Sequence, residues 1–313
     1  MKQGNILTFI LILWFFSGNA SWPRMIFVSV VMFVMFMFAL YWYQEKLLYQ
    51  PKIYPQFATP SQNPPSYRSP GEHGLQYEDV YITTPDGNKY RLRCTNRSRL
   101  HAWFIKQDSP EETKSRPTLL FFHANAGNMG FRLPNLKKLH EIVGVNILIL
   151  SYRGYGESTG SPTEEGLMMD CEATYQYLRA RTDIDQNRVL IFGRSLGSIV
   201  LRGSLVRRRV HNEDIRGLVL ENTFTCISDM VDQLFPILKF FKQWILRMHW
   251  PSIRRIALLS HPILFISGLR DEVVPAEQME RLYKAAVGSR DRRMKTVPTG
   301  QHNDTWAEGS PRN

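Results

Sequence analysis

Two kinds of apolar pattern divide this chain. Residues 25–43 read MIFVSVVMFVMFMFALYWY and carry no charge. From residue 118 onward, short apolar blocks alternate with longer segments that have helical spacing. Unbroken apolar strands that alternate with helices are typical of a parallel sheet covered on both faces. We therefore predict an α/β protein with a mostly parallel sheet and helices on both faces, preceded by a separate apolar helix.

The predicted sheet begins with strands that alternate and continues with strands that are wholly apolar. Tyr77–Thr83 alternates as a half-buried strand does, and Tyr90–Leu92 and His101–Ile105 are further strand candidates. The later predicted strands are Thr118–Phe122, Asn146–Tyr152, Arg188–Phe192, Gly217–Glu221, Pro262–Ser267 and Lys295–Pro298. The predicted helices between them are Leu133–Ile142, Glu164–Arg179, Leu196–Arg207 and Ala276–Ala286.

The apolar run at residues 25–43 has the length of a transmembrane helix. At about 1.5 Å per residue it spans the hydrocarbon layer of roughly 30 Å. Tyr41, Trp42 and Tyr43 at its end match the aromatic belt of a membrane interface. We predict a single-pass membrane protein whose partner through residues 25–43 is the lipid bilayer. The flanking charges leave its orientation open.

The apolar prefix, residues 1–24, allows several interpretations. Ile6–Phe16 is too short to span comfortably and fits a cleavable signal, one arm of a hairpin or a peripheral prefix. A signal-anchor would leave the rest of the chain lumenal, whereas cleavage after Ala20 would leave it cytosolic. Asn96 and Asn303 lie in glycosylation sequons, which are used only in a lumenal domain.

Prolines separate the membrane helix from the domain. Residues 44–74 hold six prolines, which exclude a helix beyond Tyr49 and predict an extended connector. We assign residues 75–313 to one domain, with an aromatic and basic insertion at about 223–259. That insertion fits a lid, a wall for an acyl chain, or a helix that simply covers the sheet.

Charge and cysteine content narrow the function only slightly. The chain has 39 basic and 28 acidic residues, a formal net charge of +11, but the basic residues are scattered and no nucleic-acid motif is present. A membrane surface is therefore a better partner than nucleic acid. Cys94, Cys171 and Cys226 lack metal-ligand spacing and are too few for a disulfide framework, so we expect no metal and no cofactor.

Residues 190–200, LIFGRSLGSIV, carry the strongest chemical signal. An apolar strand ends at Gly193, Ser195 follows, and a second apolar segment begins after Gly197. Gly-x-Ser-x-Gly between a strand and a helix is the nucleophile elbow of an α/β-hydrolase. The turn is so tight that the positions two residues before and after the serine pass within contact, which excludes side chains there.

Two further residues follow predicted strands in the order that this chemistry requires. Asp271 and His302 each lie in a loop after one of the last two strands, where such sheets hold their reactive groups. His302 would take the Ser195 hydroxyl proton and return it to the leaving group, while Asp271 would orient the imidazole. We predict Ser195, Asp271 and His302 as a catalytic triad, with Asp229 or Asp232 as the alternative acid.

Such a triad also needs two backbone N–H groups that stabilise the developing oxyanion. We predict the amide of Leu196, directly after the nucleophile, as the first. The second should come from the loop His123–Asn128, where we favour the amide of Asn125. The alternative is that this segment is an ordinary glycine-containing loop.

Several stretches together resemble a known family: residues 122–128, 152–158, 193–198, 221–224, 265–268 and 302–306. They are similar to membrane-anchored serine hydrolases of the alpha/beta-hydrolase superfamily, over most of residues 75–306 and the membrane segment. The resemblance implies a single-pass anchor with the catalytic domain on the lumenal or extracytoplasmic side. It also implies cleavage of a lipid ester or an acyl thioester.

Two departures from the family pattern qualify this expectation. Ala124 stands where the family has glycine, and its methyl group restricts the backbone near the oxyanion loop. The helix that normally follows the histidine is not evident after Trp306, so we expect lower stability and activity than in a chain with such a helix. These departures leave a non-catalytic, membrane-tethered interaction protein as the alternative function.

Overall fold

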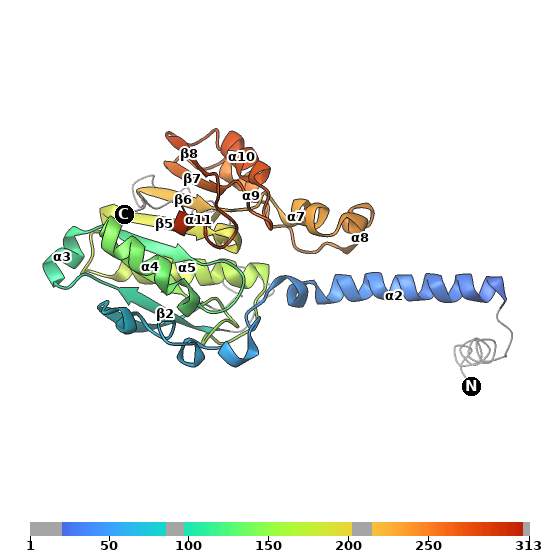
Figure 1. Ribbon diagram of the computed structural model, residues 1–313, viewed down its shortest axis with the longest axis horizontal. Coiled ribbons are helices and arrows are strands. Elements are labelled where there is room, and N and C mark those ends of the chain that lie inside the picture. Colours follow the sequence, from blue (N-terminus) through green and yellow to red (C-terminus); the bar gives the residue numbers. More distant parts are fainter. Residues whose placement is uncertain (1–20, 86–96, 202–214, 309–313) are drawn as a thin grey trace.

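A single eight-stranded sheet organises the domain. In the computed structural model, which describes residues 21–85, 97–201 and 215–308, the strand order is β1-β2-β4-β3-β5-β6-β7-β8 (Figure 1). β1 pairs with β2 and β2 with β4 in antiparallel register. The strands from β4 through β8 pair in parallel. The mostly parallel sheet predicted from the sequence is confirmed.

The strand bounds agree with the predicted ones to within three residues. The strands are β1 (Tyr77–Thr83), β2 (Arg99–Ile105), β3 (Thr118–Phe122), β4 (Asn146–Leu150), β5 (Val189–Arg194), β6 (Gly217–Glu221), β7 (Ile263–Gly268) and β8 (Arg292–Val297). β3 and β4 are buried at every position, as strands covered on both faces must be. The predicted strand Tyr90–Leu92 lies outside the described residues.

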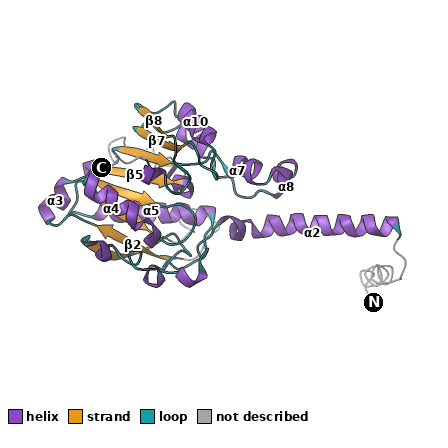
Figure 2. Cartoon of the chain, viewed as in Figure 1, coloured by secondary structure: helices purple, strands orange, loops and turns teal. Residues whose placement is uncertain are grey.

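Helices cover both faces of the sheet (Figure 2). Neighbouring side chains of β3 belong to different buried clusters. Leu119 and Phe121 of β3 lie in the same buried cluster as apolar side chains of α4, whereas Leu120 and Phe122 lie in the cluster that includes apolar side chains of α5 and α10. This division follows from the two-residue period of a strand. The helices are α2 (Trp22–Leu48), α3 (Pro110–Ser115), α4 (Leu133–Lys138), α5 (Glu164–Ala180), α7 (Ile227–Leu234), α8 (Lys242–Ile245), α9 (Ser252–Ile256), α10 (Ala276–Ala285) and α11 (Thr305–Glu308).

Two predicted helices differ from the observed ones. The predicted Leu133–Ile142 helix is divided into α4 and a π-helical turn, Leu139–Val143. In place of the predicted Leu196–Arg207 helix, the chain has the 3-10 helix η8 (Ser195–Leu201), and residues 202–214 lie outside the described part. The two helix types differ in period, 3.6 against 3.0 residues per turn, but a seven-residue segment is too short for its apolar spacing to distinguish them.

The proline-rich stretch is more structured than the extended connector that its composition predicted. It forms three 3-10 helices, η1 (Pro55–Phe57), η2 (Pro60–Gln62) and η3 (Pro70–His73). Each begins with proline, whose fixed φ suits the first turn. Asn63 is buried and exchanges two amide hydrogen bonds with Asn128, at 2.8 and 2.9 Å. The stretch therefore packs on the domain instead of acting as a free spacer.

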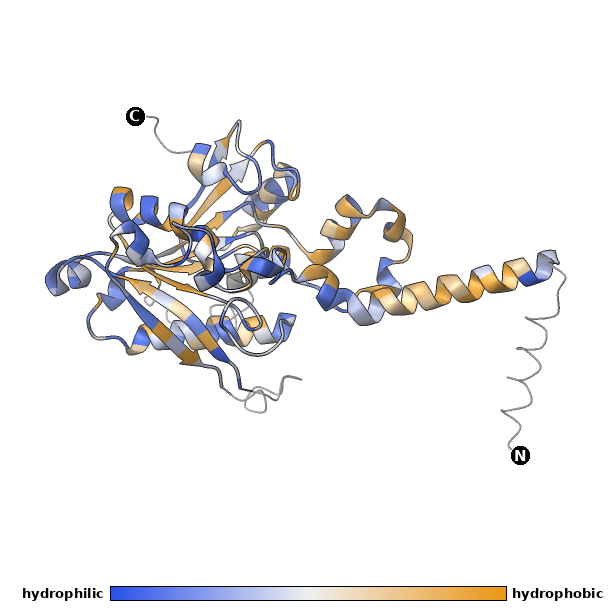
Figure 3. Cartoon of the chain, turned by 60° about the horizontal axis from the view of Figure 1, so that its bottom comes forward, coloured by the Kyte–Doolittle hydropathy of each residue, from blue (hydrophilic) through white to orange (hydrophobic). Residues whose placement is uncertain are grey.

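α2 projects from the domain (Figure 1) and is longer than the predicted span. It is the one helix of the described residues that is long and apolar enough to cross a membrane, judged by length and composition. Figure 3 shows its apolar length ending beside a second apolar element, the insertion between β6 and β7. That insertion contains α7, the 3-10 helix η9 (Pro236–Phe240), α8 and α9.

Candidate active site

Ser195 occupies a strained turn between β5 and η8. Its φ of 51° lies in the left-handed region, which residues other than glycine rarely adopt. A Cβ atom on Gly193 would lie 2.6 Å from the carbonyl oxygen of Gly197, and one on Gly197 would lie 2.2 Å from that of Phe122. The backbone is therefore as tight as the Gly-x-Ser-x-Gly pattern requires.

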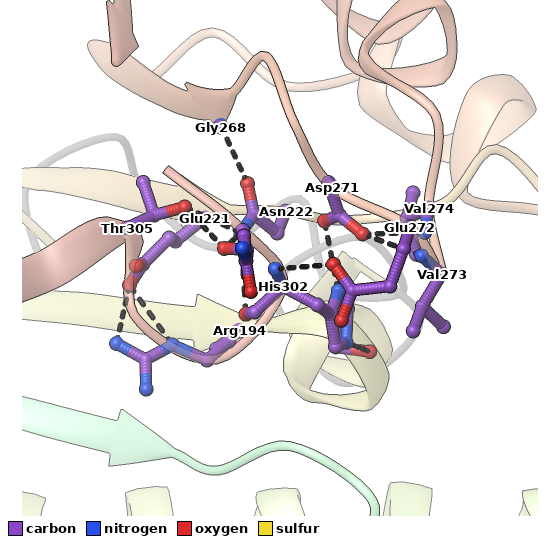
Figure 4. Close-up of polar contacts among 12 residues, drawn as sticks. Arg194, Glu221, Asn222, Gly268, Asp271, Glu272, Val273, Val274, His302 and Thr305 are labelled. Carbon is purple, nitrogen blue, oxygen red and sulfur yellow. Dashed lines mark hydrogen bonds and ion pairs between the residues drawn. The ribbon is translucent and has the colours of Figure 1, made fainter. Parts of the chain in front are cut away.

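A hydrogen-bond chain joins the three predicted triad residues. His302 Nε2 lies 3.1 Å from Ser195 Oγ, and His302 Nδ1 lies 2.8 Å from Asp271 Oδ2 (Figure 4). Ser195 and His302 are each 7% exposed, and the Asp271 side chain is 1% exposed. Because the Asp271 oxygen can only accept when ionised, Nδ1 carries the proton and Nε2 faces the serine as an acceptor. The structure thus brings together three residues of which Ser195 and His302 lie 107 positions apart.

The loop before α10 holds the Asp271 carboxylate in place. Its Oδ1 accepts the backbone N–H groups of Val273 at 2.8 Å and Val274 at 2.7 Å, leaving Oδ2 for the histidine. The two alternative acids have other partners: Asp229 pairs with Arg281 at 2.9 Å, and Asp232 pairs with Lys242 at 2.6 Å.

Asn222, to which the sequence analysis gave no role, connects the loops that carry the acid and the histidine. It follows β6 with φ of 47°, a conformation that asparagine tolerates better than most residues. Its Oδ1 accepts the Gly268 N–H at 2.9 Å, and its Nδ2 lies 2.9 Å from Thr305 Oγ1 and 3.3 Å from the His302 carbonyl oxygen. Its place directly after a predicted strand is the same signal that singled out Asp271.

The segment proposed to supply oxyanion donors is tied to the end of α2. The Asn125 side chain donates to the Leu48 carbonyl oxygen at 2.5 Å. Its Oδ1 accepts the Gln50 N–H at 3.1 Å and the Tyr155 hydroxyl at 2.7 Å. Leu196 lies in the first turn of η8, where N–H groups have no partner within the helix. The oxyanion role of the Leu196 and Asn125 amides remains a prediction.

Buried charged groups beneath the site have structural partners. Arg194 donates twice to Glu221 Oε2, at 3.0 and 2.7 Å, and so fastens β5 to β6.

Burial, together with the nearby positive charge of Arg132, lowers the pKa of His123 to about 3, so this imidazole is neutral at pH 7. Its Nδ1–H donates to the Ala124 carbonyl oxygen at 2.6 Å. Within the described residues, no group of three or more His, Cys, Asp or Glu side chains is placed to hold a metal ion.

The sheet order, the left-handed serine after β5 and the buried Ser–His–Asp chain at the carboxyl ends of the strands define an α/β-hydrolase. Solved structures with the same fold include an esterase of Pyrococcus furiosus, with a TM-score of 0.57 and 17% identity, covering 76% of this chain and 86% of that one. An α/β-hydrolase of Vibrio vulnificus has a TM-score of 0.59 and 18% identity, covering 75% and 78%. At 17% and 18% identity, the likeness to these solved structures shows the fold and nothing more.

Sequence relatives identify the family within this class. The alpha/beta hydrolase domain-containing protein WAV2 of Arabidopsis thaliana is 38% identical, over 85% of this chain and 83% of that protein. Protein bem46 of Schizosaccharomyces pombe is also 38% identical, over 85% and 82%. A Saccharomyces cerevisiae relative, 33% identical over 85% of each chain, is described as an uncharacterized membrane protein. Residues 125–272 match a family described as Chlamydia CHLPS protein (DUF818). The chain belongs to the α/β-hydrolase family of WAV2 and bem46.

Proposed function

We propose that this protein is a membrane-anchored serine hydrolase that cleaves an acyl ester or thioester through a covalent intermediate on Ser195. The observation that carries the proposal is the Asp271–His302–Ser195 hydrogen-bond chain, which ends on a serine held in the strained turn. A buried serine with a purely structural role needs neither an imidazole acceptor nor a carboxylate behind it.

The reaction follows from the positions of these groups. Ser195 Oγ attacks the carbonyl carbon of the substrate while His302 Nε2 takes the hydroxyl proton. The negative charge on the carbonyl oxygen is stabilised by the amides of Leu196 and Asn125. Collapse of this intermediate breaks the bond to the alcohol or thiol, which leaves with the proton from His302. Water then attacks the acyl-enzyme with the same imidazole as base, releasing the acid and restoring Ser195.

The imidazole can serve both steps because its orientation is fixed. Asp271 accepts the Nδ1 proton, selects the tautomer and stabilises the imidazolium that forms. Asn222 and the amides of Val273 and Val274 hold the two loops on which Asp271 and His302 lie. These contacts support a site that is assembled before substrate binds.

We further propose that residues 25–43 form a single transmembrane anchor, that residues 44–74 connect it to the domain, and that residues 75–313 form the catalytic domain. The length and composition of α2 support the anchor. A signal-anchor with a lumenal domain is what the resemblance to alpha/beta hydrolase domain-containing protein 13 implies. His-Asn-Asp-Thr-Trp at residues 302–306 carries that finer resemblance.

Labelling by a fluorophosphonate probe tests the catalytic proposal. The probe should attach covalently to the full-length protein, and Ser195→Ala should remove the label. Ser198→Ala is the matched control, because Ser198 lies three residues away and is also buried, with a hydroxyl that makes no hydrogen bond among the described residues. Equal labelling of Ser195→Ala and the parent protein would place the nucleophile elsewhere. Absence of labelling in folded parent protein would favour the non-catalytic alternative.

A further inference from the structure

The insertion between β6 and β7 exposes an unusual set of apolar side chains. We call residues 235–246 the apolar tip; it comprises η9 and α8 with their flanking residues. Four large apolar side chains of the tip are more than half exposed: Phe235 at 57%, Ile237 at 79%, Phe240 at 75% and Trp244 at 66%. Scattered exposed apolar residues are common, but such a cluster on one short element indicates a surface that something covers.

The tip is fixed against α2. The rings of Phe241 and Phe33 meet edge to face with centroids 5.2 Å apart. The Gln44 side-chain amide is buried and donates to the Ile245 carbonyl oxygen at 3.1 Å. Arg247 pairs with Glu45 and also donates to the Tyr41 carbonyl oxygen at 2.9 Å. Figure 3 shows the two apolar elements side by side.

The position of Phe33 along α2 determines how deep in the bilayer its contact with Phe241 lies. Phe33 precedes Tyr43 by ten residues, which corresponds to about 15 Å of helix. The hydrocarbon layer is about 30 Å thick, so a residue 15 Å from the interfacial end of a crossing helix lies near its middle. Because Phe241 contacts Phe33, it lies in the hydrocarbon at a similar depth. This step rests on the proposed anchor at residues 25–43.

The polar groups of the tip are compatible with that environment. Both carboxylate oxygens of Asp232, at the base of the tip, lie 2.6 Å from Lys242 Nζ, so these opposite charges are paired. Lys239 is exposed, and its long apolar stem can extend the ammonium group toward the interface. Backbone N–H groups of Phe241, Trp244 and Leu246 donate to carbonyl oxygens within the tip. Helical turns of this kind satisfy the backbone where water is scarce.

The insertion and α2 are both attached to the part of the domain where the strands have their carboxyl ends and the site lies. The Glu164 carboxylate accepts the N–H groups of His249 at 3.0 Å and Trp250 at 2.8 Å, which fixes the return of the insertion onto α5. Asn125, in the loop after β3, binds the backbone at the end of α2. We propose that the apolar tip is embedded in the leaflet that holds the C-terminal half of α2, and that together they hold the carboxyl ends of the strands, where Ser195 lies, against the lipid surface, where a lipid-borne ester is presented.

Photolabelling from within the bilayer tests this proposal. Full-length protein is reconstituted into phosphatidylcholine vesicles with a small lipid-soluble diazirine, irradiated, and mapped by mass spectrometry. Residues 25–43 and residues 235–246 should both be labelled. Val287, which is 73% exposed and lies in the loop after α10, is the matched control and should remain unlabelled. Label on residues 25–43 without label on the tip would overturn the inference and leave the anchor intact. Absence of label on both segments would overturn the proposed anchor as well as the inference about the tip.

A charged variant separates lipid contact from binding of the probe to a protein pocket. Ile237→Asp should reduce labelling of the tip by about tenfold or more, because a charged side chain is strongly disfavoured in the hydrocarbon. Labelling of residues 25–43 should be unchanged in Ile237→Asp, and Val287→Asp should leave both segments as in the parent protein. Unchanged labelling of the tip in Ile237→Asp would overturn the inference.

Discussion

Each residue of the proposed triad is held by groups that do not react. Ser195 is positioned by the two glycines that flank it, Asp271 by the amides of Val273 and Val274, and the carbonyl of His302 by Asn222. Loss of a reacting group and loss of a positioning group should therefore have separable effects on turnover.

Asp271→Asn should keep the fold and lower kcat on a short p-nitrophenyl ester by about 10⁴-fold. The amide oxygen of asparagine can still accept the Val273 and Val274 N–H groups, so the melting temperature should change little. Orientation of the His302 tautomer is lost, because the amide cannot replace the charged oxygen. Asp229→Asn and Asp232→Asn are the matched controls, and a large loss of kcat in either would place the acid there.

Asn222→Gly should lower kcat by about 100-fold, because a displacement of about 1 Å at the reacting groups has an effect of this size. Glycine accepts the φ of 47° and so removes the side-chain bonds without straining the backbone. Labelling of Ser195 by fluorophosphonate should slow in parallel. A variant with the kcat of the parent protein would show that the loops keep their positions without Asn222.

The buried His123 should make the stability of the domain depend on pH. Its pKa is about 3 in the folded state and about 6.5 when unfolded, so the unfolded state binds more protons between these values. The free energy of unfolding should therefore fall as the pH drops below 6.5, by about 2 kcal/mol between pH 7.5 and pH 5. Urea unfolding of the parent protein and His123→Asn at both pH values measures this contribution, which the variant should lack. Identical pH dependence in the two proteins would contradict it.

At the scale of elements, the turn between β5 and η8 leaves no room for a side chain at either of its two glycines. A side chain on Gly197 would meet the Phe122 carbonyl oxygen of the neighbouring strand, which cannot move without disturbing the sheet. The close approach of strand and turn is what presents Ser195 above the carboxyl ends of the strands.

Gly197→Ala should lower the free energy of unfolding by about 3 kcal/mol, the upper end of overpacking effects. The contact it creates, 2.2 Å to a backbone atom, cannot be relieved by a side-chain movement. Gly71→Ala is the control, because its Cβ would meet its nearest neighbour at an ordinary 3.4 Å. Thermal unfolding of both variants checks this, and similar melting temperatures for the two would contradict the geometry.

Most elements of the sheet were predictable because burial leaves a direct trace in the sequence. β3 is apolar after its first residue and buried throughout, and Asp271 and His302 each follow a strand of this sheet. The 3-10 form of η8 and the packed turns at residues 55–73 were not predictable, since apolar spacing and proline content do not specify which partner a segment meets. Asn222 was missed because its function depends on four atoms from two distant segments.

At the scale of the whole molecule, the proposed site lies on the side of the sheet from which α2 departs (Figure 1). The bonds from Asn125 to Leu48 and Gln50 make the end of α2 continuous with the loop after β3. The proposed anchor and the proposed site therefore have a fixed mutual orientation in the described structure.

The proposed anchor and orientation predict how the protein behaves in sealed microsomes. It should resist extraction by alkaline carbonate, because residues 25–43 have the length of a full hydrocarbon span. Protease added outside should leave residues 75–313 intact until detergent opens the membrane. Digestion of the domain in intact microsomes would place it in the cytosol and would favour cleavage after Ala20 over an uncleaved signal-anchor.

The bond between Gln44 and Ile245 joins residues 201 positions apart, which has a consequence for biosynthesis. Chains are made from the N-terminus at about 5–20 residues per second, so α2 leaves the ribosome at least about ten seconds before its partner on the insertion exists. During that interval the Gln44 side chain has no Ile245 to bind, so the proposed anchor would enter the bilayer without it. The insertion would then join a helix that is already in place, and membrane entry of the proposed anchor would precede completion of the fold.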